Sequence, residues 1–228
     1  MIYDLMPVTL ADYPGKVAAT VFVSGCNFRC PYCHNSSLIK VQPPLRTVDD
    51  ILDYLRHRRH LLDGVCITGG EPTLWDGLEG FIVSVKNEGF AVKLDTNGSR
   101  PDVLADLLNK GFLDYIAMDI KAPLTKYGDF VTRQEDVFNV KKSINIIMES
   151  DIEYEFRTTV NQNLMCMEDF IDIANCIAGA RKYVLQPYKY SDGVLNKYIC
   201  GTKPCDPAFL EQAKANIINL LPSTVIRG

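Results

Sequence analysis

The stretch AATVFVSGCNFRCPYCHN (residues 18–35) holds the pattern on which the fold and chemistry of this chain depend. Its first part, 18–25, is mainly apolar and β-branched, which is typical of a buried strand. Three cysteines follow at once in a C-x₃-C-x₂-C pattern: Cys26, Cys30 and Cys33. Taken alone, they could form a thiol–disulfide exchange site, a C-x-x-C-H haem attachment, a zinc site or an iron–sulfur cluster that lacks one ligand.

Composition narrows these choices. The chain has 228 residues, of which 47% are apolar and 23% are charged, as in an ordinary globular protein. A net charge of −4 gives no basic footprint for nucleic acid. No apolar run is long enough to span a bilayer, and MIYDLMPVTL (1–10) does not read as a signal peptide. We therefore expect a cytoplasmic protein with neither nucleic acid nor membrane as a partner.

The expected location decides how the eight cysteines are interpreted. In a reducing compartment, clustered thiols usually bind metal or carry out redox chemistry. Haem attachment is disfavoured because no export signal is visible. Zinc signatures usually contain two separated ligand pairs, and thiol exchange at CPYC leaves Cys26 without a role. A four-iron cluster uses all three cysteines and leaves one iron with an open position. The pattern favours a cluster, with zinc and thiol exchange as minor alternatives.

Strand-like and helix-like segments alternate along the chain. Six such units predict an α/β fold with a parallel sheet and outer helices, open or curled into a partial barrel, since a closed barrel needs eight. No linker divides the chain, so we expect one domain over residues 1–228, with a surface loop at 188–205. The predicted strands are 18–25, 64–68, 90–95, 115–120, 153–160 and 182–187; the predicted helices are 47–62, 76–88, 101–110, 134–149, 167–179 and 206–221.

Chemically active residues follow these strands. Because the carboxyl ends of parallel strands share one edge of a sheet, where α/β folds bind ligands, we expect one active rim. The six strands would bring to it Cys26, Gly69-Gly70-Glu71-Pro72, Asp95-Thr96-Asn97-Gly98, Asp119-Ile120-Lys121, Arg157 and Gln186-Pro187-Tyr188.

The motifs together resemble a known family. CNFRCPYC (26–33) looks like the cluster loop (24–35) of radical S-adenosylmethionine (SAM) enzymes, and GGEP (69–72) resembles their second motif. LADYPGK (10–16), LDTNG (94–98) and MDIKAP (118–123) resemble the activating enzymes of glycyl-radical enzymes. The similarity is strongest to anaerobic ribonucleoside-triphosphate reductase activating proteins. It implies a single radical SAM domain with a partial (β/α)₆ barrel.

The resemblance also implies residue roles. Cys26, Cys30 and Cys33 would hold one [4Fe-4S] cluster, and Tyr32 takes the aromatic position of the loop. The remaining predicted SAM-binding residues fall into three sets. Gly69, Gly70 and Glu71 would receive the amino group; Asp95, Thr96 and Asp119 would hold the cosubstrate and a monovalent cation; Lys121 and Arg157 would lie near its carboxylate.

The reaction implied by this resemblance is activation of a partner enzyme. A flavodoxin- or ferredoxin-type donor would reduce the cluster, SAM would yield a 5′-deoxyadenosyl radical, and this radical would remove hydrogen from a glycine of anaerobic ribonucleotide reductase. Three alternatives stay open: activation of a different glycyl-radical enzyme, a ring rearrangement of a purine- or pterin-like molecule, and a simple iron–sulfur or thiol redox module. The chain lacks a ferredoxin-like cysteine insert, so one cluster is expected.

The other cysteines have plainer interpretations. Cys66, within an apolar strand, is expected to be a buried thiol, and Cys166 and Cys176 likewise. Cys200 and Cys205 are expected to be free thiols on the 188–205 loop.

Overall fold

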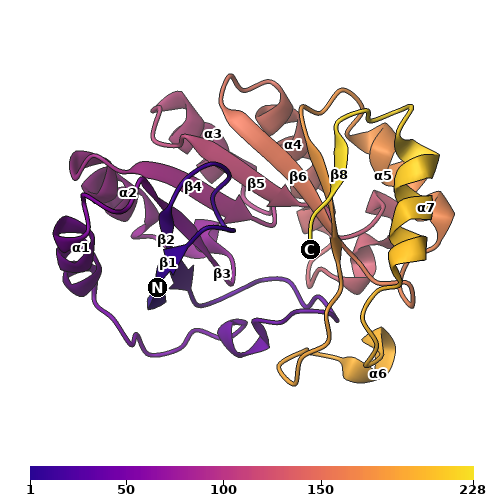
Figure 1. The fold of residues 1–228 in the computed structure, drawn as a ribbon, viewed down its shortest axis with the longest axis horizontal. Coiled ribbons are helices and arrows are strands. Elements are labelled where there is room, and N and C mark those ends of the chain that lie inside the picture. The colour runs from indigo at the N-terminus through magenta and orange to yellow at the C-terminus, as the bar shows by residue number, and fades with distance from the viewer.

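One curved sheet of eight strands forms the centre of the computed structural model, which describes residues 1–228 (Figure 1). Neighbouring strands in the sheet are also consecutive in the chain. The strands are β1 (Ile2–Thr9), β2 (Ala18–Val23), β3 (Gly64–Gly69), β4 (Ala91–Thr96), β5 (Tyr115–Asp119), β6 (Glu153–Val160), β7 (Tyr183–Pro187) and β8 (Thr224–Ile226).

Every strand pair from β2 to β8 is parallel. The pairing of β2 with β3 runs without interruption from Ala18↔Gly64 to Val23↔Gly69, so both strands end at the same level. A helix connects each strand from β3 to β8 to the one before it, and these helices lie around the outer side of the sheet (Figure 1). The predicted partial α/β barrel is therefore confirmed.

The helices lie where helical spacing was expected. Thr47 caps the first of them: its hydroxyl accepts a hydrogen bond from the backbone N–H of Asp50, whose carboxylate accepts one from the N–H of Thr47. The α-helices are α1 (Val48–His57), α2 (Leu78–Asn87), α3 (Pro101–Asn109), α4 (Glu135–Met148), α5 (Met167–Cys176), α6 (Lys197–Cys200) and α7 (Pro207–Ile217), with short 3₁₀ helices at Ser36–Leu38, Pro72–Leu74 and Leu124–Asp129.

Two strands were not predicted. β1 pairs antiparallel with β2, so the sheet is not wholly parallel. Its residues show no clean alternation of buried and exposed side chains, because β1 is an edge strand with two irregularities in its register. The three-residue β8 is too short to leave a periodic signal and is held by its pairing with β7.

The sequence predicts a surface loop at 188–205, but this segment is partly helical and partly buried. It contains α6, whose first turn is capped by the side chain of Asn196, and it buries Tyr188, Cys200 and Cys205. Backbone hydrogen bonds from Leu195 to Cys33 and from Asn196 to Pro31 tie it to the cysteine loop. Long-range contacts of this kind cannot be read from local composition.

For the remaining cysteines, the structure confirms some of the predictions and contradicts others. Cys66 is fully buried in β3, and Cys200 and Cys205 are free thiols, as expected. The expected burial of Cys166 is wrong, since it is exposed at the N-cap of α5; Cys176 is only partly buried.

The two faces of the sheet differ in chemistry. Along β4, Val92 and Leu94 belong to the main apolar core, while the alternate residues Lys93 and Asp95 form an ion pair inside the curve of the sheet. A separate small apolar cluster includes Ala18 and Tyr115, which stand at the amino ends of their strands, so the inside becomes polar toward the carboxyl ends. None of the helices has the length and apolar character needed to cross a membrane.

Candidate active site

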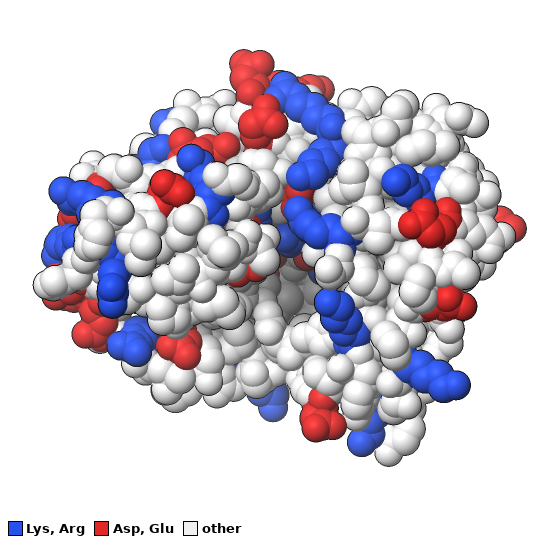
Figure 2. Space-filling model, in the orientation of Figure 1, with Lys and Arg blue, Asp and Glu red and all other residues white.

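A cavity of about 250 Å³ opens at the carboxyl ends of the parallel strands. Figure 2 shows a hollow in the middle of the molecule's face, with charged side chains inside it. The structure brings all of the predicted site residues to this cavity. They are Cys26, Cys30, Tyr32, Cys33, Gly69, Gly70, Glu71, Asp95, Thr96, Asp119, Lys121 and Arg157.

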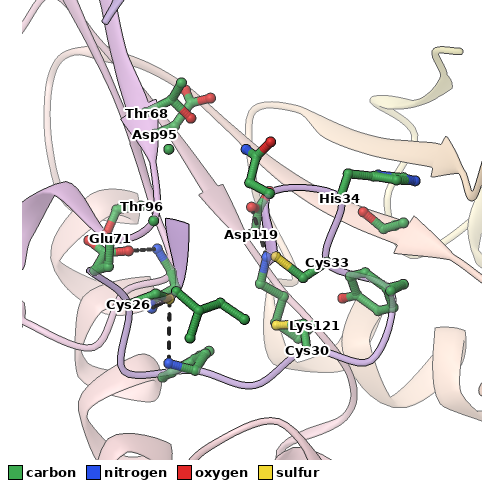
Figure 3. Close-up of a pocket in the computed structure, with 18 of the residues that line it drawn as sticks. Cys26, Cys30, Cys33, His34, Thr68, Glu71, Asp95, Thr96, Asp119 and Lys121 are labelled. Atoms are coloured by element: carbon green, nitrogen blue, oxygen red, sulfur yellow. Dashed lines mark hydrogen bonds and ion pairs between the residues drawn. The ribbon is translucent and has the colours of Figure 1, made fainter. Parts of the chain in front are cut away.

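The cysteine loop is fastened at several points. The backbone N–H of Gly25 donates to Leu38 O at 2.8 Å, and the N–H of Arg29 donates to Phe130 O at 2.7 Å. Figure 3 shows Cys26 on the side of the cavity near Glu71 and Thr96, with Cys30 and Cys33 on the side near Lys121.

The surroundings of the thiols disfavour free thiolates. Burial raises the pKa of Cys26 to about 11 and that of Cys30 to about 12. A bound metal centre would reverse this, because it holds its thiol ligands deprotonated.

The GGEP turn packs directly on the cysteine loop. Gly69 has a φ of +117°, and a Cβ on Gly70 would lie 2.8 Å from the carbonyl carbon of Gly25, so both positions require glycine. The N–H of Glu71 donates to Gly25 O at 2.8 Å. Glycine thus lets β3 and the loop after β2 approach closely.

Glu71 joins the GGEP turn to the loop after β4. Its side chain is buried, and it accepts hydrogen bonds from the Thr96 hydroxyl at 2.7 Å, the Asn97 N–H at 2.6 Å, and the Thr73 hydroxyl and N–H. Burial raises the pKa of Glu71, although these donors act in the opposite direction. Four donors use the acceptor positions of one carboxylate. Glu71 therefore positions two loops of the site.

A row of alternating charges crosses three strands beside these loops. Arg157 on β6 donates to Asp95 on β4 at 3.0 Å and to Asp119 on β5 at 2.8 Å. Lys121 donates to Asp119 at 2.9 Å, and Lys93 donates to the other oxygen of Asp95. Burial would lower the pKa of Lys121 and of Arg157, but Asp119 raises both well above their usual values. Burial raises the pKa of Asp119, but the positive charges of Arg157 and Lys121 outweigh this effect and hold the pKa far below its normal value.

Comparison with known proteins identifies the family of this chain. Residues 20–177 match the family model described as the Radical SAM superfamily. The chain belongs to the radical SAM superfamily. A Methanocaldococcus jannaschii protein named "Putative glycyl-radical enzyme activating enzyme" is 34% identical over 200 residues, 84% of this chain and 81% of that protein. The pyruvate formate-lyase-activating enzyme of Staphylococcus aureus is 35% identical over 133 residues, 53% of this chain and 52% of that enzyme.

Solved structures show the same radical SAM fold. Streptococcus suis SuiB, bound to the precursor peptide SuiA, superposes with a TM-score of 0.70 at 13% identity; the match covers 91% of this chain and 48% of SuiB. At this identity the likeness concerns the fold alone.

Membership of the superfamily implies a [4Fe-4S] cluster and SAM, and the cavity suits both. Cys26, Cys30 and Cys33 line it with no fourth cysteine, so a cluster held by these three thiols would have one iron available for a further ligand. No three His, Cys, Asp or Glu side chains converge to hold a single metal ion. A cluster does not need such convergence, because each cysteine binds a different iron. Tyr32 also lines the cavity, and its hydroxyl is buried without a hydrogen-bond partner.

The sequence places Asn97 on this rim without a role, and it does not predict His34 or Lys93 as residues of the site. Asn97 lines the cavity and donates to Asn27 at 3.1 Å, and its side-chain nitrogen lies 3.9 Å from the Cys26 sulfur. His34 stacks on Tyr188 with ring centroids 5.9 Å apart. Lys93 supports the charge row from beneath. Its signal was visible in FAVKLD (90–95), where a lysine interrupts a buried strand.

Proposed function

We propose that this radical SAM enzyme activates a glycyl-radical enzyme by removing a hydrogen atom from one glycine of its partner. The observation that carries the proposal is the meeting of the cysteine loop, GGEP, DTNG and MDIK in one cavity. Overall similarity to a named activating enzyme across 84% of the chain supports it.

Each set of residues has a proposed task. Cys26, Cys30 and Cys33 hold the cluster. Together the reduced cluster and SAM supply a 5′-deoxyadenosyl radical when both are bound. Around them, Glu71 keeps the GGEP turn and the loop after β4 in register, so that backbone groups of the turn meet the amino group. Lys121 and Arg157 place positive charge where the SAM carboxylate binds.

The shape of the mouth supports a polypeptide substrate. A second cavity of about 370 Å³ adjoins the first and shares Arg157, Thr159, Gln186 and His34 with it. It continues outward past Lys189 and the last two residues of the chain. We infer that a glycine-bearing loop of another protein approaches the SAM site along these two adjoining cavities.

The surface beside the cysteine loop suits a protein partner as well. Tyr198 is 91% exposed and Leu195 is 42% exposed, although both lie in the segment that is hydrogen-bonded to that loop. Exposed large apolar side chains grouped in this way often mark an interaction surface. We infer that the partner is an anaerobic ribonucleotide reductase and that the electron donor is of the flavodoxin or ferredoxin type, on the resemblance of LADYPGK, LDTNG and MDIKAP.

Electron paramagnetic resonance (EPR) tests the proposal. Anaerobically reconstituted, reduced protein is mixed with SAM, with and without an anaerobic ribonucleotide reductase of the same organism. We expect a glycyl radical doublet only in the complete mixture, and none with the Cys30→Ala variant. A cluster signal that changes with SAM but gives no glycyl radical would refute this partner and direct the test to other glycyl-radical enzymes and then to small molecules.

A further inference from the structure

Lys93 is a buried lysine directly beneath the active site. Its side chain is 1% exposed, and its ammonium group donates to Asp95 Oδ1. It also lies 3.6 Å from the sulfur of Cys66 and 6.0 Å from the centre of the Tyr115 ring. A lysine at such depth is rare and needs a compensating charge, which Asp95 provides.

The carboxylates expected to hold a monovalent cation are already occupied by cationic side chains. Asp95 binds Lys93 through one oxygen and Arg157 through the other. Asp119 likewise binds Arg157 and Lys121 through separate oxygens. Three cationic side chains therefore already surround these four oxygens, and their positive charge disfavours a further monovalent cation at the same place.

The five charged side chains that form the row have a net charge of +1. Lys93, Arg157 and Lys121 contribute +3, and Asp95 and Asp119 contribute −2, so the sum is 3 − 2 = +1. One carboxylate of a bound ligand would neutralise the group. Without Lys93 the remaining four side chains sum to zero, and Arg157 alone would face Asp95.

We propose that Lys93 is a built-in cation of the SAM site, which neutralises Asp95 from below and makes binding of the SAM carboxylate independent of a dissociable monovalent ion. Lys93 is a positioning residue, because it lies outside the cavity lining and acts through Asp95 and Arg157. The inference rests on the proposed use of SAM and does not depend on which partner is activated.

SAM affinity in different salts tests the inference. The affinity for SAM is measured by isothermal titration calorimetry and by the change that SAM causes in the EPR signal of the reduced cluster. Buffers contain potassium, sodium or tetramethylammonium chloride at equal ionic strength. We expect wild-type affinity to be the same in all three. The Lys93→Met variant should lose about tenfold or more in tetramethylammonium and regain affinity in potassium or sodium.

Two further variants make the test specific. Lys93→Arg keeps the positive charge, so its affinity for SAM should be the same in all three salts. Lys182→Met removes a lysine that pairs with Glu155 away from the SAM cavity and should behave like wild type. The inference is overturned if the wild-type protein binds SAM only in potassium or sodium, and this outcome does not require that Lys93→Met folds. It is also overturned if Lys93→Met folds and binds SAM in tetramethylammonium with wild-type affinity. Wild-type protein that binds no SAM in any salt refutes the proposed function itself.

Discussion

Replacing Gly69 with alanine should destabilise the protein more than any comparable glycine replacement outside the site. Gly69 ends β3 with a φ of +117°, which an L-residue adopts at a cost of about 1–2 kcal/mol. A Cβ there would also lie 2.5 Å from the backbone nitrogen of Val23, its partner in β2. An ordinary contact begins at 3.4 Å, so two paired strands would have to separate by about 3.4 − 2.5 = 0.9 Å.

That separation is costly because it cannot be absorbed by a flexible side chain. The N–H of Gly70 donates to Val23 O at 2.7 Å, and the shift would strain this hydrogen bond. Overpacking of this kind costs about 1–3 kcal/mol, which gives a total of about 2–5 kcal/mol together with the backbone term. The cysteine loop follows Val23 directly, so we also expect reduced iron content after reconstitution.

Two matched variants isolate these contributions. Gly111 has a φ of +67° with open space around it, so Gly111→Ala should cost only about 1 kcal/mol. Gly80 lies in helix α2 with nothing near its Cβ position, so Gly80→Ala should stabilise by about 0.5–1 kcal/mol. Urea unfolding followed by circular dichroism, under anaerobic conditions, ranks the three. Equal midpoints for Gly69→Ala and Gly111→Ala would show that the close strand contact carries no energetic weight.

Three further outcomes are expected. Cys66→Ala should keep full iron content whereas Cys26→Ala should lose the cluster, as iron analysis and EPR of reconstituted proteins will show; iron loss in Cys66→Ala would disprove the ligand assignment. Burial raises the pKa of Glu155, but the ion pair with Arg227 outweighs this effect and lowers the pKa from 4.5 to about 2. The ionised carboxylate therefore stabilises the fold by about 3 kcal/mol above pH 4.5. This stability should be lost as pH falls from 4.5 toward 2, and Glu155→Gln should show a flatter pH dependence of the urea midpoint; parallel curves would contradict the pairing. Thr47→Ala should lower stability by about 1 kcal/mol through loss of the α1 cap, while Thr47→Ser should not, as urea midpoints will test.

Local sequence patterns determined much of this protein. The six strands from β2 to β7 and the six longer helices follow from apolar runs and helical spacing, because each pattern reflects which side of an element is buried. The order of strand ends along the chain also predicted one rim, since carboxyl ends of parallel strands share an edge. Cys26, Glu71 and Asp119 could thus be assigned to one cavity without coordinates.

Only the tertiary structure decided how these side chains satisfy one another. The four donors around Glu71 come from the 3₁₀ helix Pro72–Leu74 and from the end of β4, and the row from Lys93 to Lys121 draws on β4, β5 and β6. The antiparallel β1 and the attachment of 188–205 to the cysteine loop likewise depend on contacts between distant segments. Sequence spacing records the period of an element but not its neighbours, and the energy of a buried charge is set by its neighbours.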